Sequence, residues 1–295
     1  MVDLNGIGTE TRNDRTKDLD LLSVKEIIEI MNEEDKKVLE AIRTAIPQIE
    51  ALIQETIKAY RNGGRIIYIG AGTSGRLGLM DAVEVIPTYN SDRFVGLIAG
   101  GDNAFVKAVE GAEDSEELCV CDLKGLELNS SDFVLGIAAS GRTPYVIGGL
   151  DYARSLGCKT GCLCCNINTK IAKHCDFPIE LSAGPEVVTG STRLKSGTCQ
   201  KIVLNMISTV TMVKIGKVYG NLMVDVKATN EKLVERCRRI VMEATGCDHE
   251  TADQALNQVD NNCKAAIVMI LLNISAEEAL QRLNKTQDNI RKALE

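Results

Sequence analysis

Two patterns of apolar residues alternate along the first 225 positions of the chain. Short runs that are apolar at nearly every position are separated by stretches in which apolar residues recur every three or four positions. Runs that are apolar on both faces are typical of strands buried in a parallel sheet, and the longer spacing favours helices. The alternation predicts an α/β fold with a doubly wound, five-stranded parallel sheet of the flavodoxin-like type. The predicted strands are 65–69, 94–99, 133–138, 160–166 and 177–181.

Helical patterns flank this region on both sides. A polar arm of about 22 residues precedes Ser23 and Glu26, which have the spacing of a capping box and predict a helix start. A longer helix is expected from about 34 to 62, and Pro47 should kink or divide it. After residue 225 only short helical patterns follow, so we expect a small helical C-terminal module. They cover 230–245, 248–259, 262–272 and 275–283, which suggests an N-terminal arm with helices (1–50), a sheet domain (51–225) and the module (226–295).

The composition limits the kinds of ligand that the protein can bind. The formal net charge of −7 argues against a surface for nucleic acid or an anionic membrane, so a phosphate-bearing ligand needs a local site. The N-terminus lacks the apolar region of a signal peptide, and 202–218 carries Asn205, Lys214 and Lys217, which favours a buried helix over a membrane span. We expect a cytoplasmic protein whose eleven cysteines are mostly buried, reduced thiols.

Metal binding is the alternative for the cysteines. The stretch CKTGCLCCN (158–166), followed by His174, contains four thiols. Its spacing does not match the paired C-x2-C pattern of a zinc ribbon, and alternate residues of a strand point to opposite faces. We therefore expect no metal site.

A glycine motif follows the first predicted strand. Gly70, Gly72 and Gly75 form a G-x-G-x-x-G sequence, the pattern of dinucleotide-binding loops. The acidic residue that such a fold places about 20 residues later is absent, because that window falls inside the strand 94–99. Arg76 also follows Gly75 where a phosphate-binding P-loop has lysine. The motif therefore does not indicate a dinucleotide.

A second loop repeats part of the first. Ser-Gly-Arg occurs at 74–76 and again at 140–142, each time after a predicted strand. In a doubly wound sheet both loops reach the carboxyl edge, and their hydroxyl and backbone N–H groups at a helix start suit an anion. The alternative is two turns that only reverse the chain. The predicted binding residues are Gly72, Thr73, Ser74, Ser140, Gly141, Arg142 and Thr143.

Several long motifs resemble one family in the same order. GAGTSGRLG, IAASGRTPYV and EVVTGSTRLKSGT resemble the sugar isomerase (SIS) domain, and more narrowly the N-acetylmuramic acid 6-phosphate etherase family, which is related to the glucokinase regulatory protein. The resemblance extends to ETRNDRT, AVEGAEDS, GNLMVDVKATNEKL and the C-terminal helices. The chain departs at DAVEVIPTY, where the family more often has Ser-Glu-Cys-Pro-Pro, and 90–94 is about two residues short.

The resemblance implies a lyase of cell-wall amino-sugar recycling that splits the D-lactyl ether of N-acetylmuramic acid 6-phosphate. Lactate is eliminated and water is added, which gives N-acetylglucosamine 6-phosphate and D-lactate without a metal or redox cofactor. The family pattern carries the acid and base carboxyl groups onto Glu84 and Glu113, with Glu110 as a reserve, because His174 and His249 are more typical of structural or surface residues. The same pattern predicts substrate contacts for Glu186, Ser191 and Lys195.

The sequence also allows these residues to be ordinary surface residues without a role in the reaction. Glu84 and Glu113 could lie on solvated helix faces, although the apolar neighbours of Glu84 (Val83, Val85 and Ile86) favour burial and a raised pKa. Arg193 and Lys195 could be surface charges. An aldose–ketose phosphate isomerase, or a sugar-phosphate sensor that binds a partner protein, are the other functions that the same motifs allow.

Helix geometry raises a question about the two halves of the site. Glu84 follows Ser74 by ten residues, which is about 15 Å along an unbroken helix and longer than one hexose. Either the helix breaks before Pro87, or Glu84 serves the phosphate loops of another subunit. The apolar helix 202–218 and the polar arm would both suit a dimer interface. We therefore expect a homodimer with its active sites at or near the interface.

Overall fold

The sheet has the predicted architecture. The computed structural model describes residues 8–107, 109–228 and 230–295. Within them a five-stranded parallel sheet has the order β2-β1-β3-β4-β5, as expected for a flavodoxin-like doubly wound fold. The strands are β1 (Ile66–Gly70), β2 (Phe94–Ile98), β3 (Phe133–Ala138), β4 (Lys159–Cys164) and β5 (Phe177–Glu180), each within two residues of its predicted limits.

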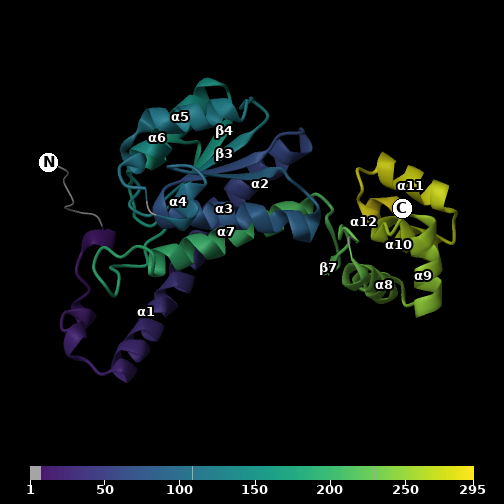
Figure 1. Ribbon diagram of the computed structural model, residues 1–295, viewed down its shortest axis with the longest axis horizontal. Helices are drawn as coiled ribbons and strands as arrows, with labels where there is room; N and C mark the ends of the chain where they lie inside the picture. Colours follow the sequence, from purple (N-terminus) through teal and green to yellow (C-terminus); the bar gives the residue numbers. More distant parts are fainter. Residues whose placement is uncertain (1–7, 108, 229) are drawn as a thin grey trace. The chain divides into compact units, whose positions relative to one another are not determined.

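Helices cover both faces of this sheet (Figure 1). On one face α3 (Gly72–Tyr89) packs closely, since a Cβ on Gly78 would lie 3.2 Å from the Cβ of Tyr68. On the other face α6 (Pro144–Ser155) packs equally closely, since a Cβ on Gly149 would lie 2.6 Å from the side chain of Ile69. Because Tyr68 and Ile69 are neighbours on β1, they point to opposite faces. The helix α2 (Ile46–Arg61) lies on the Tyr68 face, and α5 (Glu116–Gly125) lies beside α6.

The N-terminal helices differ in one respect from the prediction. The capping box at Ser23 and Glu26 is confirmed, because both of its hydrogen bonds form. The helix that it starts, α1 (Val24–Thr44), continues through residue 34, so the expected second start there is wrong. The break falls at Ala45, and Pro47 occupies the first turn of α2, where its missing N–H needs no partner.

Shorter elements connect the larger ones. The helix α7 (Lys195–Lys214) confirms the buried helix expected around 202–218, and β6 (Val218–Tyr219) and β7 (Leu222–Met223) form an antiparallel pair that the sequence did not predict. No helix of the described residues has the length and apolarity needed to cross a bilayer. The remaining short helices are α4 (Asn103–Val106), η1 (Gly8–Glu10), η2 (Asp14–Thr16), η3 (Leu19–Leu21), η4 (Ala112–Asp114) and η5 (Ile171–His174).

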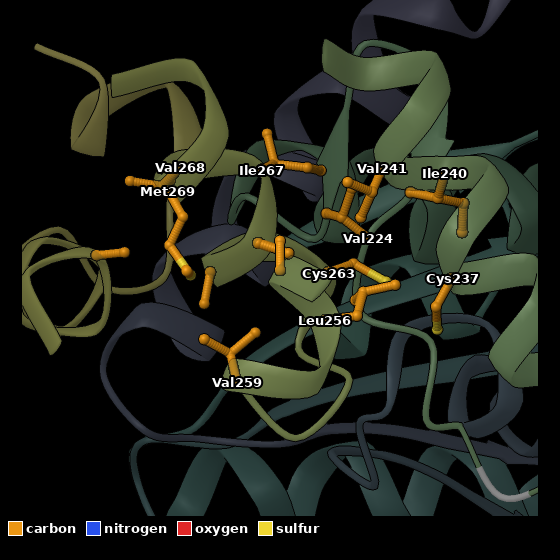
Figure 2. Packing of buried hydrophobic residues seen from close by; sticks show 14 of the residues in the cluster. Val224, Cys237, Ile240, Val241, Leu256, Val259, Cys263, Ile267, Val268 and Met269 are labelled. Carbon is orange, nitrogen blue, oxygen red and sulfur yellow. The ribbon is translucent and has the colours of Figure 1, made fainter. Parts of the chain in front are cut away.

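The chain divides into two compact units. The first comprises the described residues up to Val83 together with Arg93–Ser208, and the second comprises Glu84–Asp92 and Thr209–Glu295. In the second, α10 (Cys263–Leu272) lies in the apolar core, and Cys263 to Met269 are all buried (Figure 2). Each of its helices starts at an Asn, Asp or Ser whose side chain accepts a backbone N–H, which confirms the predicted helical segments. The four predicted helices are α8 (Glu231–Thr245), α9 (His249–Gln258), α10 (Cys263–Leu272) and α11 (Ala276–Lys285), and the short α12 (Ile290–Ala293) was not predicted.

Candidate active site

The two Ser-Gly-Arg loops leave neighbouring strands at one edge of the sheet. β1 pairs with β3, and Gly70 lies opposite Ile137 at their carboxyl ends. Each strand is followed by a helix, α3 after β1 and α6 after β3. The first loop requires glycine at position 75, because a Cβ there would lie 2.7 Å from the carbonyl oxygen of Gly70. The expected juxtaposition at the carboxyl edge is therefore present.

Three hydroxyl groups of these loops are available to a ligand. The side chains of Thr73, Ser140 and Thr143 are half-buried and have no hydrogen bond among the described residues. Thr143 stands at the N-cap of α6, but its side chain does not cap the helix. Hydroxyls at a helix start without protein partners are the groups that an anion can recruit.

Ser74 and Gly141 are engaged within the protein instead. Ser74 is only 7% exposed, and its Oγ donates a hydrogen bond to Oε1 of Gln200 at 2.9 Å. The N–H of Gly141 donates to the carbonyl oxygen of Ala138 at 3.2 Å, so the expectation that this N–H is free for an anion is wrong. Gly141 shapes the loop, since its φ of +72° favours glycine and a Cβ would lie 2.2 Å from the side chain of Thr169.

A pocket of about 210 Å³ opens beside the first loop. Gly72 and Arg76 line it from the start of α3, and Glu110 and Glu113 line it from the segment that follows α4. Neither carboxylate has a hydrogen bond or ion pair among the described residues. Glu110 lies in a turn before η4 and not on a helix with Glu113, yet both face the same pocket. The structure thus brings the predicted base beside the predicted anion loop.

Arg76 connects the start of α3 to α4 beside this pocket. Its guanidinium donates to the carbonyl oxygens of Ala104 (Nη2, 2.7 Å) and Phe105 (Nε, 2.9 Å), both in α4. Because the two N–H groups of one guanidinium donate to adjacent carbonyl oxygens, they hold α4 against the start of α3. In the sequence Arg76 stands out as part of the first Ser-Gly-Arg and in place of a P-loop lysine, and neither feature indicates this role.

Glu84 lies in a different environment from the one expected. It is exposed on α3, as are Val83 (55%) and Ile86 (49%), and only Val85 is buried. The expectation that these neighbours bury Glu84 is therefore wrong for the single chain. The helix α3 also continues to Tyr89 with Pro87 inside it, so of the two alternatives the break before Pro87 is excluded.

Glu186 and Lys195 hold the start of α7. Glu186 is fully buried, and its carboxylate accepts the backbone N–H groups of Lys195 and Ser196, both at 2.9 Å, and the Ser196 hydroxyl at 2.7 Å. Lys195 is 1% exposed and donates to Glu34 at 2.7 Å, so the interpretation of Lys195 as a surface charge is wrong, whereas Arg193 is exposed. Two of the three predicted contact residues thus have partners within the chain, and the third, Ser191, is half-buried.

Glu34 ties the N-terminal arm to this region. Burial alone would raise the pKa of Glu34, but hydrogen bonds from Lys195, Lys37 and Asn13 outweigh it and lower the pKa to about 2. Asn13 also donates to the carbonyl oxygen of Pro185 at 3.4 Å. The sequence around Glu34 shows only a helical pattern. It gives no indication of the hydrogen bonds to Asn13 and Lys195.

A second buried carboxyl was also missed by the sequence analysis. Asp81 on α3 accepts hydrogen bonds from Ser208 (3.1 Å) and Tyr68 (3.2 Å). Burial raises the pKa of Asp81 to about 6, although both hydrogen bonds and the charge of Lys201 act in the opposite direction. No group of three or more His, Cys, Asp or Glu side chains within the described ranges is arranged to hold a metal ion.

Known proteins with similar sequences cover nearly the whole chain. Residues 48–154 match the family model of the glucokinase regulatory protein N-terminal SIS domain. An N-acetylmuramic acid 6-phosphate etherase of Exiguobacterium sp. is 54% identical over 99% of this chain and 100% of its own length. The etherase of Bacillus cereus strain G9842 is 55% identical with the same coverage, and that of Lactococcus lactis subsp. cremoris is 59% identical over 90% of both chains.

Solved structures agree on the fold. A phosphoheptose isomerase from Neisseria gonorrhoeae has a TM-score of 0.50 at 15% identity, over 64% of this chain and 98% of its own. One from Francisella tularensis has the same TM-score at 16% identity, over 65% and 98%. At such identities the likeness shows the sugar isomerase fold alone. With relatives above 50% identity over its whole length, the chain belongs to the N-acetylmuramic acid 6-phosphate etherase family.

Proposed function

We propose that the protein cleaves the D-lactyl ether of N-acetylmuramic acid 6-phosphate to give N-acetylglucosamine 6-phosphate and D-lactate. Relatives with this activity in their names match the chain end to end at 54–55% identity. The observation that carries the proposal is the pocket at the carboxyl edge of the sheet, because Gly72 of the anion loop and the carboxylate of Glu113 both line it. The protein has eleven free cysteines, eight of them buried, which suits the reducing cytoplasm, where we place it.

The loops would hold the 6-phosphate of the sugar. Thr73, Ser140 and Thr143 offer hydroxyls that have no partner in the described part of the chain, and Ser74 can join them if its bond to Gln200 is exchanged. Binding energy from this remote group positions C2 and C3 against the carboxylates. Ser140→Ala should weaken binding of N-acetylglucosamine 6-phosphate in calorimetry and leave the weak binding of N-acetylglucosamine unchanged. Equal losses for both sugars would remove Ser140 from the phosphate site.

The chemistry requires one base and one acid. In the open-chain sugar the aldehyde acidifies the proton on C2, and the Glu113 carboxylate takes that proton. The C3–O bond then breaks, a C2–C3 double bond forms, and Glu84 protonates the departing lactate oxygen. Glu84 next removes a proton from water as its oxygen adds to C3, and Glu113 returns a proton to C2. Glu110 faces the same pocket and is the alternative base.

Isotope exchange separates the two roles. Glu84→Gln should still exchange the C2 proton with deuterated solvent but release little lactate, because the acid is missing. Glu113→Gln should lose both exchange and lactate release. The reverse pattern would assign the roles the other way. Lactate release by the unmodified protein, measured against aldose–ketose interconversion, distinguishes the etherase from an isomerase, and its absence would refute the proposal.

A second subunit would complete the site. Because α3 is unbroken, the ten residues from Ser74 to Glu84 rise by about 15 Å, more than the length of one hexose. Glu84 is exposed in the single chain, and Met80, Val83 and Ile86 on the same helix are exposed apolar residues that an interface would cover. We infer a homodimer in which Glu84 serves the phosphate loops of the partner.

Subunit exchange tests this arrangement. Glu84→Gln and Ser140→Ala each inactivate a different half of a composite site, so a mixed dimer regains one intact site. Mixing the two inactive proteins should therefore restore lactate release as subunits exchange. If mass spectrometry shows exchange and no activity returns, each subunit has a complete site of its own.

A further inference from the structure

Among the residues that the structure describes, Gln200 beside the first Ser-Gly-Arg loop has a buried amide that is only half satisfied. It lies on α7, is 0% exposed, and accepts the hydroxyl proton of Ser74 at 2.9 Å through Oε1. Its Nε2 has no hydrogen-bond partner among the described residues. Orphaned buried N–H donors are rare in proteins, so this arrangement calls for a physical reason.

The hydrogen bond to Gln200 points the Ser74 hydroxyl away from any ligand. A hydroxyl has one proton, and when Ser74 donates it to Gln200 the ligand side of Oγ carries only lone pairs. Lone pairs repel a phosphate, whose oxygens are acceptors. Ser74 can bind phosphate only after its proton is released from Gln200.

Rotation of the Gln200 amide by half a turn releases that proton. Nε2 then takes the place of Oε1 and donates to Ser74 Oγ, and the Ser74 hydroxyl is free to donate to the anion. The rotation gives Nε2 a partner and leaves Oε1 unpaired instead, so one amide atom lacks a partner among the described residues in either orientation and a bound anion decides between them. We propose that Gln200 is a positioning residue for the phosphate site, whose amide turns over on anion binding and orients the Ser74 hydroxyl toward the 6-phosphate.

The packing around Gln200 places its amide beside the proposed phosphate loop. The first turns of α7 and α3 lie against each other, since a Cβ on Gly197 would be 3.5 Å from the side chain of Thr73. Gln200 comes one turn after Gly197 on α7, and Ser74 follows Thr73 on α3. An occupant of the loop can therefore act directly on the side-chain amide of Gln200 through Ser74. The inference rests on the proposed phosphate site at Ser74.

Two substitutions of similar size separate positioning from packing. In Gln200→Glu the introduced carboxylate can only accept, so it holds the Ser74 proton permanently, whereas Gln200→Met has no strong acceptor and leaves the hydroxyl free. We expect calorimetry at pH 8 to show that Gln200→Glu binds N-acetylglucosamine 6-phosphate at least about tenfold more weakly than the unmodified protein. Gln200→Met should stay within about threefold. A packing role alone predicts the opposite order, because only Gln200→Glu keeps the bond to Ser74.

The pH dependence gives a second readout. A protonated carboxyl can donate to Ser74 Oγ as the turned amide does, so the defect of Gln200→Glu relative to the unmodified protein should shrink as the pH falls from 8 to 6. The KM for the phosphorylated substrate should follow the same trend, while kcat changes little. If thermal unfolding shows that Gln200→Met does not fold, the pH dependence of Gln200→Glu relative to the unmodified protein is the test. A binding defect that does not change with pH overturns the inference.

Ser74→Ala distinguishes failure of the inference from failure of the site. If Ser74→Ala leaves the affinity for N-acetylglucosamine 6-phosphate unchanged, the phosphate site at Ser74 is wrong and the role of Gln200 falls with it. If Ser74→Ala weakens binding and Gln200→Glu does not, the site stands and only the role of Gln200 is refuted. In the double variant of Ser74→Ala with Gln200→Glu, the second change should add little to the first.

Discussion

Asp81→Asn should stabilise the protein increasingly as the pH rises. In the folded chain Asp81 is buried between α3, β1 and α7, and burial raises its pKa from the ordinary value of 3.8 to about 6. A raised carboxyl pKa means that the folded state favours the protonated form. The stability that this form contributes is fully present below pH 3.8 and is lost as the pH rises through 6.

The magnitude follows from the two pKa values. A pKa difference of one corresponds to about 1.4 kcal/mol, so ionised Asp81 at pH 8 costs the folded state about 3 kcal/mol relative to low pH. At pH 5 the same carboxyl costs only about half as much, because it is then mostly protonated in the folded chain. The neutral amide of Asn titrates in neither state. It can still accept from one of the two hydroxyls and donate to the other.

Urea unfolding of both proteins at pH 5, 6, 7 and 8 measures this difference. Hydrogen exchange of peptides from α3 and α7 should provide the readout, because the chain has two compact units that can unfold separately. The stability of Asp81→Asn relative to the unmodified protein should rise by about 1–2 kcal/mol between pH 5 and pH 8. Ser208→Ala, which keeps the carboxyl but removes a hydrogen bond to its charged form, should change stability in the opposite direction at pH 8. A difference that is flat with pH would refute the reasoning.

Three further predictions concern the surroundings of the site. Lys195→Met removes a buried cation from Glu34 and should lower the free energy of unfolding by about 3–5 kcal/mol, whereas a loss below about 1 kcal/mol in urea would show that the other partners suffice. Gly148→Ala would place a Cβ 2.5 Å from the carbonyl oxygen of Glu116, and the resulting overpacking should cost about 1–3 kcal/mol; an unchanged Tm would contradict this. Arg76→Lys keeps the charge but cannot hold two carbonyls of α4, so kcat for lactate release should fall about tenfold while calorimetry shows nearly unchanged affinity for N-acetylglucosamine 6-phosphate. Loss of both together would place Arg76 in the phosphate site.

The sequence by itself determined the sheet and the positions of its loops. Strands such as 133–138 are apolar at every position, and this marks burial on both faces without any knowledge of the partners. Helix starts at Ser23 and Ser275 follow from caps whose hydrogen bonds span three residues. The two Ser-Gly-Arg loops reach one edge because parallel strands end together. All these features depend on local spacing or on a general rule of sheet topology.

Only the tertiary structure decided which groups of the site are engaged. Ser74 and Gln200 are 126 residues apart in the sequence, and Lys195 and Glu34 are 161 apart, so no periodicity relates them. The exposure of Glu84 likewise depends on what packs on α3, which its apolar neighbours did not reveal. Hydrogen bonds and burial between distant segments arise from how whole elements pack, and packing places side chains to within an ångström, a precision that residue types along one helix do not carry.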